Sequence, residues 1–205
     1  MTVAAILLAA GASRRMGSPK PLLPWGDRTL IAWEVDELMR SSVEEIVVVT
    51  GSRSEAVRRA LGDGARYCLF NRRWAHGRAG SLAAGARALL SVEPTPEAVV
   101  IQNVDQPTRA DIIDRLVRER AERDADAVQP SHRGHGAHPI VVSGRLLGEL
   151  AAVEERTFGL RALLDRHPPH RVPMDDEPVV ALDLDTPDTL EEGRRVLGIG
   201  EATSR

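Results

Sequence analysis

The segment from Gly11 to Lys20 combines the residue types that bind phosphate groups. It reads GASRRMGSPK and follows a short apolar run. Glycines let the backbone approach a ligand and point N–H groups at it, the guanidinium of Arg14 or Arg15 can clasp two phosphate oxygens, and Lys20 adds a point charge. The spacing fits neither a P-loop nor a G-x-G-x-x-G fingerprint. The residue types therefore predict a polyphosphate ligand, with a solvated basic loop as the alternative.

Two acidic segments are placed to hold a metal ion near such a ligand. Asp105 directly follows a predicted buried strand, and the segment LDLDTPD carries Asp183 and Asp185. In a strand, residues two apart share a face, and carboxylates are ligands that Mg²⁺ prefers. The structural alternatives are a turn aspartate before Pro107 and a cap for a helix that begins near Pro187.

Apolar segments alternate with amphipathic ones along the first 125 residues. Strands are predicted at 3–10, 44–51, 65–70 and 97–107, and helices at 29–40, 54–61, 81–90 and 111–123. Strands that are apolar on both faces and separated by helices predict a three-layer, Rossmann-like α/β fold with a mostly parallel sheet. Ligands bind at the carboxyl ends of such strands, which is where Gly11 and Asp105 lie.

The pattern changes after residue 125. Short strands with some antiparallel pairing are predicted at 125–130, 137–142, 170–174 and 179–185, and a closing helix at 187–198. We therefore expect one domain over 1–198, with a nucleotide-binding half (1–125), an acceptor-binding half (126–198) containing a small antiparallel β element, and a tail at 199–205.

Composition excludes several classes of protein. The chain has 205 residues, 42% apolar, with a net charge of −3, which argues against a general nucleic-acid binder. Its one cysteine, Cys68, excludes a disulfide framework within the chain and a cysteine zinc site, and is predicted to be a buried hydrophobic residue. No signal peptide or membrane-length apolar run is present. A cytoplasmic protein is expected.

The segment LAAGASRRMGSPKPLLP resembles the signature of the MobA-like, GT-A-type nucleotidyltransferases, L-A-x-G-x-x-x-R-M-G-x-x-K. It resembles the molybdenum cofactor cytidylyltransferase branch most. Further similar segments follow in the family's order: VVVTG, GRAGSLAAG, VDQP, AHPIVVS and LDLDTPDTL. The resemblance implies a GT-A type fold and a glycine-rich loop that holds the triphosphate of a nucleotide.

The resemblance also implies the site residues. Arg15, Lys20 and Asp105 would be catalytic, with Mg²⁺ on Asp105 and on Asp185 rather than Asp183. The implied nucleotide-binding residues are Leu8, Ala9, Ala10, Gly11, Ala12, Ser13, Arg15, Lys20, Thr50, Gly51, Gly80 and Ser81.

An acceptor loop is implied by the same resemblance, with His138 and Pro139 near the acceptor. Ala137 stands where the family usually has glycine, which leaves the acceptor open. A metal cluster of His132, His135 and His138 is the alternative, but a glycine-rich loop gives it no rigid geometry.

The implied reaction is transfer of CMP from CTP to a phosphate-bearing acceptor, namely molybdenum-molybdopterin, with release of pyrophosphate. Ala10 favours CTP, because the guanylyltransferase branch tends to have glycine there, although one methyl group discriminates weakly. A molybdoenzyme would receive the product. The alternatives are GTP or another nucleotide with a sugar or alditol phosphate, a non-catalytic nucleotide-binding maturation factor, and an oxidoreductase.

Overall fold

Strand β1 (Val3–Ala9) lies inside the main sheet between two other strands, and all seven of its residues are buried. In this computed structural model, which describes residues 1–13 and 16–200, it pairs in parallel with β4 (Glu45–Thr50) and β6 (Ala98–Asn103). The sheet order is β10-β7-β9-β6-β1-β4-β5, and β8 pairs with β7. The remaining strands of this sheet are β5 (Cys68–Phe70), β7 (Ala127–His132), β8 (His135–Gly136), β9 (Ile140–Ser143) and β10 (His170–Pro173).

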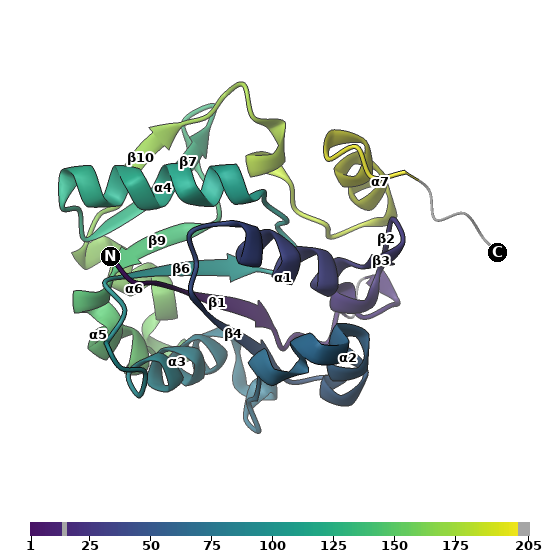
Figure 1. Ribbon diagram of the computed structural model, residues 1–205, viewed down its shortest axis with the longest axis horizontal. Helices are drawn as coiled ribbons and strands as arrows, with labels where there is room; N and C mark the ends of the chain where they lie inside the picture. The colour runs from purple at the N-terminus through teal and green to yellow at the C-terminus, as the bar shows by residue number, and fades with distance from the viewer. Residues whose placement is uncertain (14–15, 201–205) are drawn as a thin grey trace.

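Helices cover both faces of the sheet, which gives three layers (Figure 1). One face carries α1 (Leu30–Arg40), α2 (Ser54–Leu61) and α4 (Ala110–Arg123), and the other carries α3 (Arg78–Leu89), α5 (Leu147–Ala151) and α6 (Gly159–Arg166). No helix in the described part of the chain is long and apolar enough to cross a membrane.

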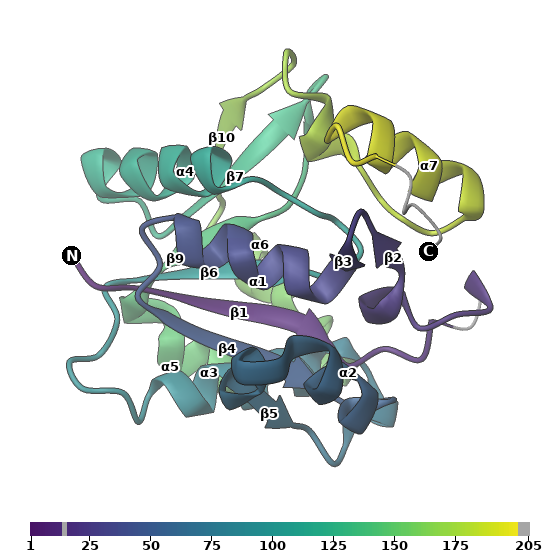
Figure 2. The ribbon, with the colours of Figure 1, turned by 45° about the vertical axis from the view of Figure 1, so that its right-hand side comes forward.

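The antiparallel pairing expected in the C-terminal half is present. Strand β9 runs antiparallel to β6 and β7, inside the main sheet, and β8 runs antiparallel to β7. A separate antiparallel hairpin, which the sequence did not indicate, joins β2 (Pro24–Trp25) to β3 (Arg28–Thr29). It lies beside α7 (Pro187–Val196) at one end of the molecule (Figure 2). Beyond α7, Ile199 packs against the core, and residues 201–205 lie outside the described part.

Two predicted strands differ from the structure. The third is only β5, because 3-10 helix η3 (Gly62–Tyr67) takes up the residues before it, and Cys68 is half-buried at this sheet edge rather than buried. The segment 179–185 forms no strand: it begins in 3-10 helix η7 (Pro178–Ala181) and continues as coil. Its alternating apolar residues are buried, but they pack on the core without a partner strand.

Gly85 and Gly148 form a matched pair for testing the packing of the second helical layer. A Cβ on Gly85 would lie 2.6 Å from Cγ2 of Ile6, whereas Gly148 has open space around it. We expect Gly85→Ala to lower the free energy of unfolding by about 1–3 kcal/mol through overpacking, and Gly148→Ala to lower it by nothing or to raise it slightly. Chemical denaturation measures both, and equal effects would contradict the packing argument.

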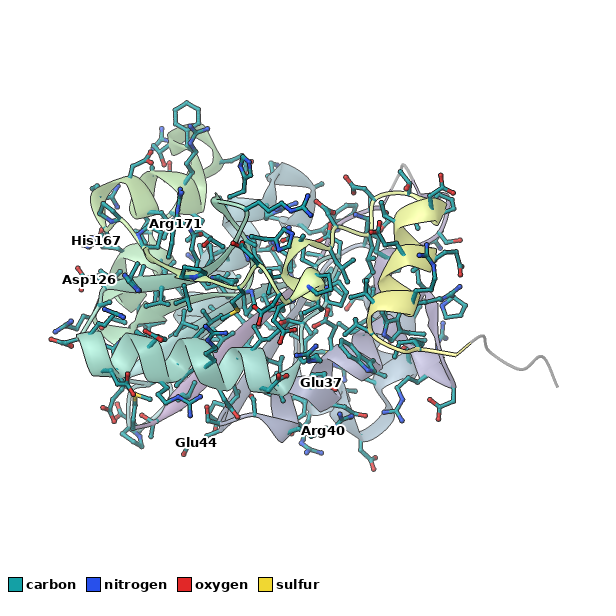
Figure 3. All side chains as sticks on the ribbon, turned by 90° about the horizontal axis from the view of Figure 1, so that it is seen from above. Glu37, Arg40, Glu44, Asp126, His167 and Arg171 are labelled. Carbon is teal, nitrogen blue, oxygen red and sulfur yellow. The ribbon has the colours of Figure 1, made fainter. Side chains whose placement is uncertain are left out.

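The imidazole of His167 lies between two carboxylates, those of Asp126 and Glu149. Figure 3 shows His167 and Asp126 at the edge of the molecule. Its Nδ1 lies 2.9 Å from Asp126 and its Nε2 3.1 Å from Glu149. The hydrogen bond with Asp126, together with Glu149, raises the pKa of His167 above its ordinary value against a smaller opposing effect of desolvation.

The protonated form of His167 therefore stabilises the fold below the ordinary histidine pKa, and this stabilisation is lost as the pH rises through the raised pKa. We expect the unfolding temperature of His167→Gln to fall further below that of the wild type at pH 6 than at pH 9. Thermal unfolding of both proteins across this range is the measurement. A difference that does not change with pH would contradict the role of the imidazolium.

Candidate active site

A cleft of about 480 Å³ lies where β1 and β6 end. It is lined by the residues that follow these strands, by the start of α3 and by one residue from the segment before α7. The sequence-predicted residues among its lining are Leu8, Ala9, Ala10, Gly11, Ala12, Ser13, Lys20, Ser81, Asp105 and Asp185. Segments far apart in the chain are thus brought together at the carboxyl ends of parallel strands, as expected for this class of sheet.

The glycine-rich loop is closed by its own side chains. Ser13 adopts a positive φ of 49°, and its Oγ accepts a hydrogen bond of 2.9 Å from the backbone N–H of Lys20. This bond joins Ser13 to the end of the loop. A Cβ added at Gly11 would meet no heavy atom within 4 Å, so the space beside this glycine is open. Arg15, which we expected to bind phosphate, lies with Arg14 outside the described residues.

Lys20 is buried between two of the predicted metal ligands. Its Nζ lies 2.8 Å from Oδ2 of Asp105 and 2.5 Å from Oδ1 of Asp185, and the residue is only 8% exposed. Burial lowers the pKa of Lys20, but its hydrogen bonds and charge interactions with the two carboxylates outweigh that effect and raise it. Lys20 is therefore a permanent cation at the centre of an acidic cluster.

Asp183 completes this cluster. One carboxylate oxygen each from Asp105, Asp183 and Asp185 lies within 4.8 Å of the others. Desolvation, followed by the charges of Asp105 and Asp185, raises the pKa of Asp183. Three carboxylates facing one ammonium leave an excess of negative charge, and carboxylate oxygens at this separation suit a hard divalent cation. The donor set therefore fits Mg²⁺ or Mn²⁺.

The segment that carries Asp183 and Asp185 is held by its backbone rather than by a strand. The N–H of Leu184 donates to the carbonyl of Asp105 over 2.8 Å, and the Leu184 side chain is fully buried. Thr186, not Asp185, caps α7. The two acids thus reach the same acidic cluster, and Asp185 reaches the cleft, by a route that the strand argument did not foresee.

A buried glutamate lies near the acidic cluster. Glu34 of α1 is fully buried, and desolvation, with the charges of Asp105 and Glu37, raises its pKa well above the ordinary value. Burial in this position therefore favours the neutral carboxyl group of Glu34 over its carboxylate.

The far wall of the cleft comes from the start of α3 and the residues before it. Ser81 accepts a hydrogen bond of 3.0 Å from the Asn71 side chain, and Trp74 lines the cleft while packing on Gly51. Asn71 and Trp74 were not predicted, because they lie in a short irregular segment with no recognisable spacing. Thr50, Gly51 and Gly80 do not line the cleft, and the Oγ1 of buried Thr50 faces Ser54 at 2.8 Å.

A second cavity of about 750 Å³ adjoins the cleft, and Leu8, Arg78 and Asn103 line both. His138 lies in this second cavity, with its Nδ1 3.4 Å from the carbonyl of Ile101, and Pro139 is buried beside it. Burial lowers the pKa of His138, which keeps it neutral at pH 7. Nearby, Arg161 and Arg171 also line the cavity.

Residues 5–172 match the MobA-like NTP transferase domain. The chain belongs to this family. The match covers the glycine-rich loop, the strand before Asp105 and the second cavity. The α/β fold with its mostly parallel sheet is also that of solved nucleotidyltransferases, as the structural comparisons show.

Curated relatives of this MobA-like chain carry several functions. It is 30% identical to nicotine blue oxidoreductase of Paenarthrobacter nicotinovorans, over 81% of this chain and 83% of that one. It is 28% identical to the molybdenum cofactor cytidylyltransferase of Escherichia coli, over 89% and 91%. It is 36% identical to the bifunctional protein GlmU of Symbiobacterium thermophilum over 61% of this chain, but spans only 26% of that longer protein.

Among solved structures, a homologue of Mycobacterium tuberculosis Rv0371c from Mycobacterium sp. strain JC1 has a TM-score of 0.77 at 29% identity, covering 96% of this chain and 97% of its own. A structure of Rv0371c itself in complex with manganese has a TM-score of 0.73 at 23% identity, covering 94% and 98%. The second likeness supports the fold alone.

Proposed function

We propose that this protein transfers CMP from CTP to a phosphate-bearing acceptor and releases pyrophosphate. The observation that carries the proposal is the cluster of Lys20, Asp105, Asp183 and Asp185, three of which (Lys20, Asp105 and Asp185) line a cleft together with the glycine-rich loop. Such a cluster combines a fixed cation for phosphate oxygens with carboxylates for a divalent metal, which phosphoryl transfer requires.

The reaction needs positioning and charge more than proton transfer. A phosphate monoester has a second pKa near ~6 and is largely ionised at pH 7, so its oxygen can attack the α-phosphorus of CTP without a strong base. The new P–O bond forms as the bond to the β-phosphate oxygen breaks. Lys20, and Arg15 by resemblance, would neutralise the triphosphate. Mg²⁺ on Asp105 and on Asp185 or Asp183 would supply further charge neutralisation when bound.

Molybdenum-molybdopterin is the acceptor that we propose. The support is the similarity to the E. coli cytidylyltransferase over nearly the whole of both chains. Ala10, at the position where resemblance favours CTP, lines the cleft. A molybdoenzyme would then receive the product. The single cysteine is consistent with a cytoplasmic enzyme.

Calorimetry with CTP, GTP, ATP and UTP, each with and without Mg²⁺, tests the proposal. We expect tight, Mg²⁺-dependent binding with a preference for CTP. A preference for GTP would support a nucleotidyltransferase that uses GTP instead of CTP, with a sugar or alditol phosphate as the alternative acceptor. Binding of CTP without turnover on molybdenum-molybdopterin would favour a maturation factor. No nucleotide binding at all would contradict the proposal.

An oxidoreductase is the second candidate, and the 30% identity to nicotine blue oxidoreductase favours it. A nicotinamide nucleotide also carries phosphates, which the same loop could receive. The two candidates predict different titrations: an oxidoreductase binds NADH or NADPH more tightly than CTP, and the proposed transferase binds CTP more tightly. Including NADH and NADPH in the calorimetric series decides between them.

A further inference from the structure

Arg78 stands at the junction of the two cavities. It is the first residue of α3, its side chain is exposed, and it lines both the nucleotide cleft and the second cavity. Among the described residues, no other cationic side chain lines both: Lys20 belongs to the cleft alone, and Arg161 and Arg171 to the second cavity alone. Arg78 therefore lies where a group in one cavity meets a group in the other.

The charge of Arg78 reaches both sites. It acts on Asp183 of the acidic cluster, where it favours the ionised carboxylate, and on His138 of the second cavity, where it opposes protonation. No described residue forms a hydrogen bond or an ion pair with its guanidinium, in contrast to Arg171, which donates to the carbonyl of Gly134 over 3.0 Å. Within residues 1–13 and 16–200, the guanidinium donors of Arg78 thus have no hydrogen-bond or ion-pair partner.

The side chain of Glu155, which lines the second cavity, contacts the residues on both sides of Arg78. Glu155, in 3-10 helix η6 (Glu155–Thr157), accepts a hydrogen bond of 2.9 Å from the N–H of Ala79. The same carboxylate packs against Gly77, where φ is +116° and a Cβ would lie 2.4 Å from Glu155 Oε2. The helix N-terminus is thus already occupied by a carboxylate, and the anion-binding capacity at this point belongs to the Arg78 side chain.

We propose that Arg78 is a catalytic residue that binds the attacking phosphate of the acceptor and directs it at the nucleotide's α-phosphate. The inference rests on the proposed function for the reaction. Partly buried, neutral His138 lacks the charge that a dianionic phosphate requires, and a guanidinium provides parallel donors for two phosphate oxygens. The acceptor class that fits is a phosphate monoester whose phosphate enters the junction while its remainder occupies the second cavity.

The test uses phenyl phosphate as the acceptor probe and cytidine 5′-(α,β-methylene)triphosphate as a nucleotide that cannot react. Calorimetry measures phenyl phosphate binding to the protein in Mg²⁺, with and without saturating nucleotide analogue. The variants are Arg78→Gln, Arg78→Lys and the control Arg72→Gln, because Arg72 is exposed and lines neither cavity.

We expect Arg78→Gln to weaken phenyl phosphate binding by about ten- to a hundredfold, Arg78→Lys to weaken it less, and Arg72→Gln to leave it unchanged. The nucleotide analogue should bind all four proteins within about threefold. The proposal is overturned if wild type does not bind phenyl phosphate, if Arg78→Gln binds it as wild type does, or if Arg78→Gln weakens the analogue equally. If the wild-type protein failed to bind the nucleotide analogue, the proposed function would be refuted instead. Titration of phenyl phosphate in the absence of nucleotide would then still test the role of Arg78.

Discussion

Replacing Asp105 with asparagine is expected to abolish the Mg²⁺ dependence of CTP binding and to lower the transfer rate by about 10²–10³-fold. Asp105 is central to the acidic cluster, since it contributes to the candidate metal site, bonds Lys20 and fixes Leu184 through its carbonyl. Asparagine keeps the size and the backbone bond but removes the charge. The loss would therefore come from the metal and from the position of Lys20, not from unfolding.

Calorimetry of CTP with and without Mg²⁺ measures the first effect, and pyrophosphate release measures the second. Asp111→Asn is the matched control, because Asp111 is an exposed aspartate whose ion pair with Arg109 lies outside the cleft. It should leave both quantities unchanged. An Asp105→Asn protein that still binds CTP in a fully Mg²⁺-dependent manner would show that Asp105 is not a metal ligand.

The parts of the fold that sequence predicted well are those whose signal is local. β1, β4 and β6 are continuous apolar runs ended by polar or small residues, and α1, α2 and α4 end within about two residues of their expected limits. Buried parallel strands need apolar side chains on both faces, so their pattern survives any tertiary context.

The secondary-structure predictions were wrong or incomplete where tertiary packing, rather than the local sequence, determines the element. Residues 182–185 alternate apolar and polar side chains as a strand does, yet Pro178 begins a 3-10 helix just before them and no described strand pairs with them. Helices α5, of five residues, and α6, of eight residues, were not foreseen. The hairpin β2–β3 consists of two-residue strands and gave no signal at all.

The candidate site shows the same division. Gly11 and Asp105 could be located because each closely follows a strong strand, and Lys20 because it ends the basic loop that begins at Gly11. Asp183 and Asp185 were grouped for the wrong reason, since the bond between Leu184 and Asp105 holds them and no strand does. Trp74 and Arg78 were missed as individual cavity-lining residues, because only the folded chain shows which cavity a residue near a loop or a helix start will line.

Lys20→Met is expected to raise the affinity of the protein for Mg²⁺ and to lower its affinity for CTP. The Lys20 ammonium lies between Asp105 and Asp185, so it competes with a divalent cation for the same oxygens. Its raised pKa keeps the Lys20 side chain charged at neutral pH. Methionine retains the length and apolar stem but leaves three carboxylates facing each other. Without nucleotide, Mg²⁺ should therefore bind the variant more tightly than the wild type.

CTP binding should change in the other direction. Loss of a charge-assisted contact to the triphosphate should weaken CTP by about ten- to a hundredfold in Lys20→Met. Mg²⁺ titrations followed by thermal unfolding, and calorimetry with CTP, measure the two effects separately. Arg123→Met is the control, because its ion pair with Glu119 is on the surface and contributes little. If Mg²⁺ raised the unfolding temperatures of wild type and Lys20→Met equally, Lys20 would not compete with the metal. The acidic cluster would then bind its cation at a position that the ammonium does not occupy.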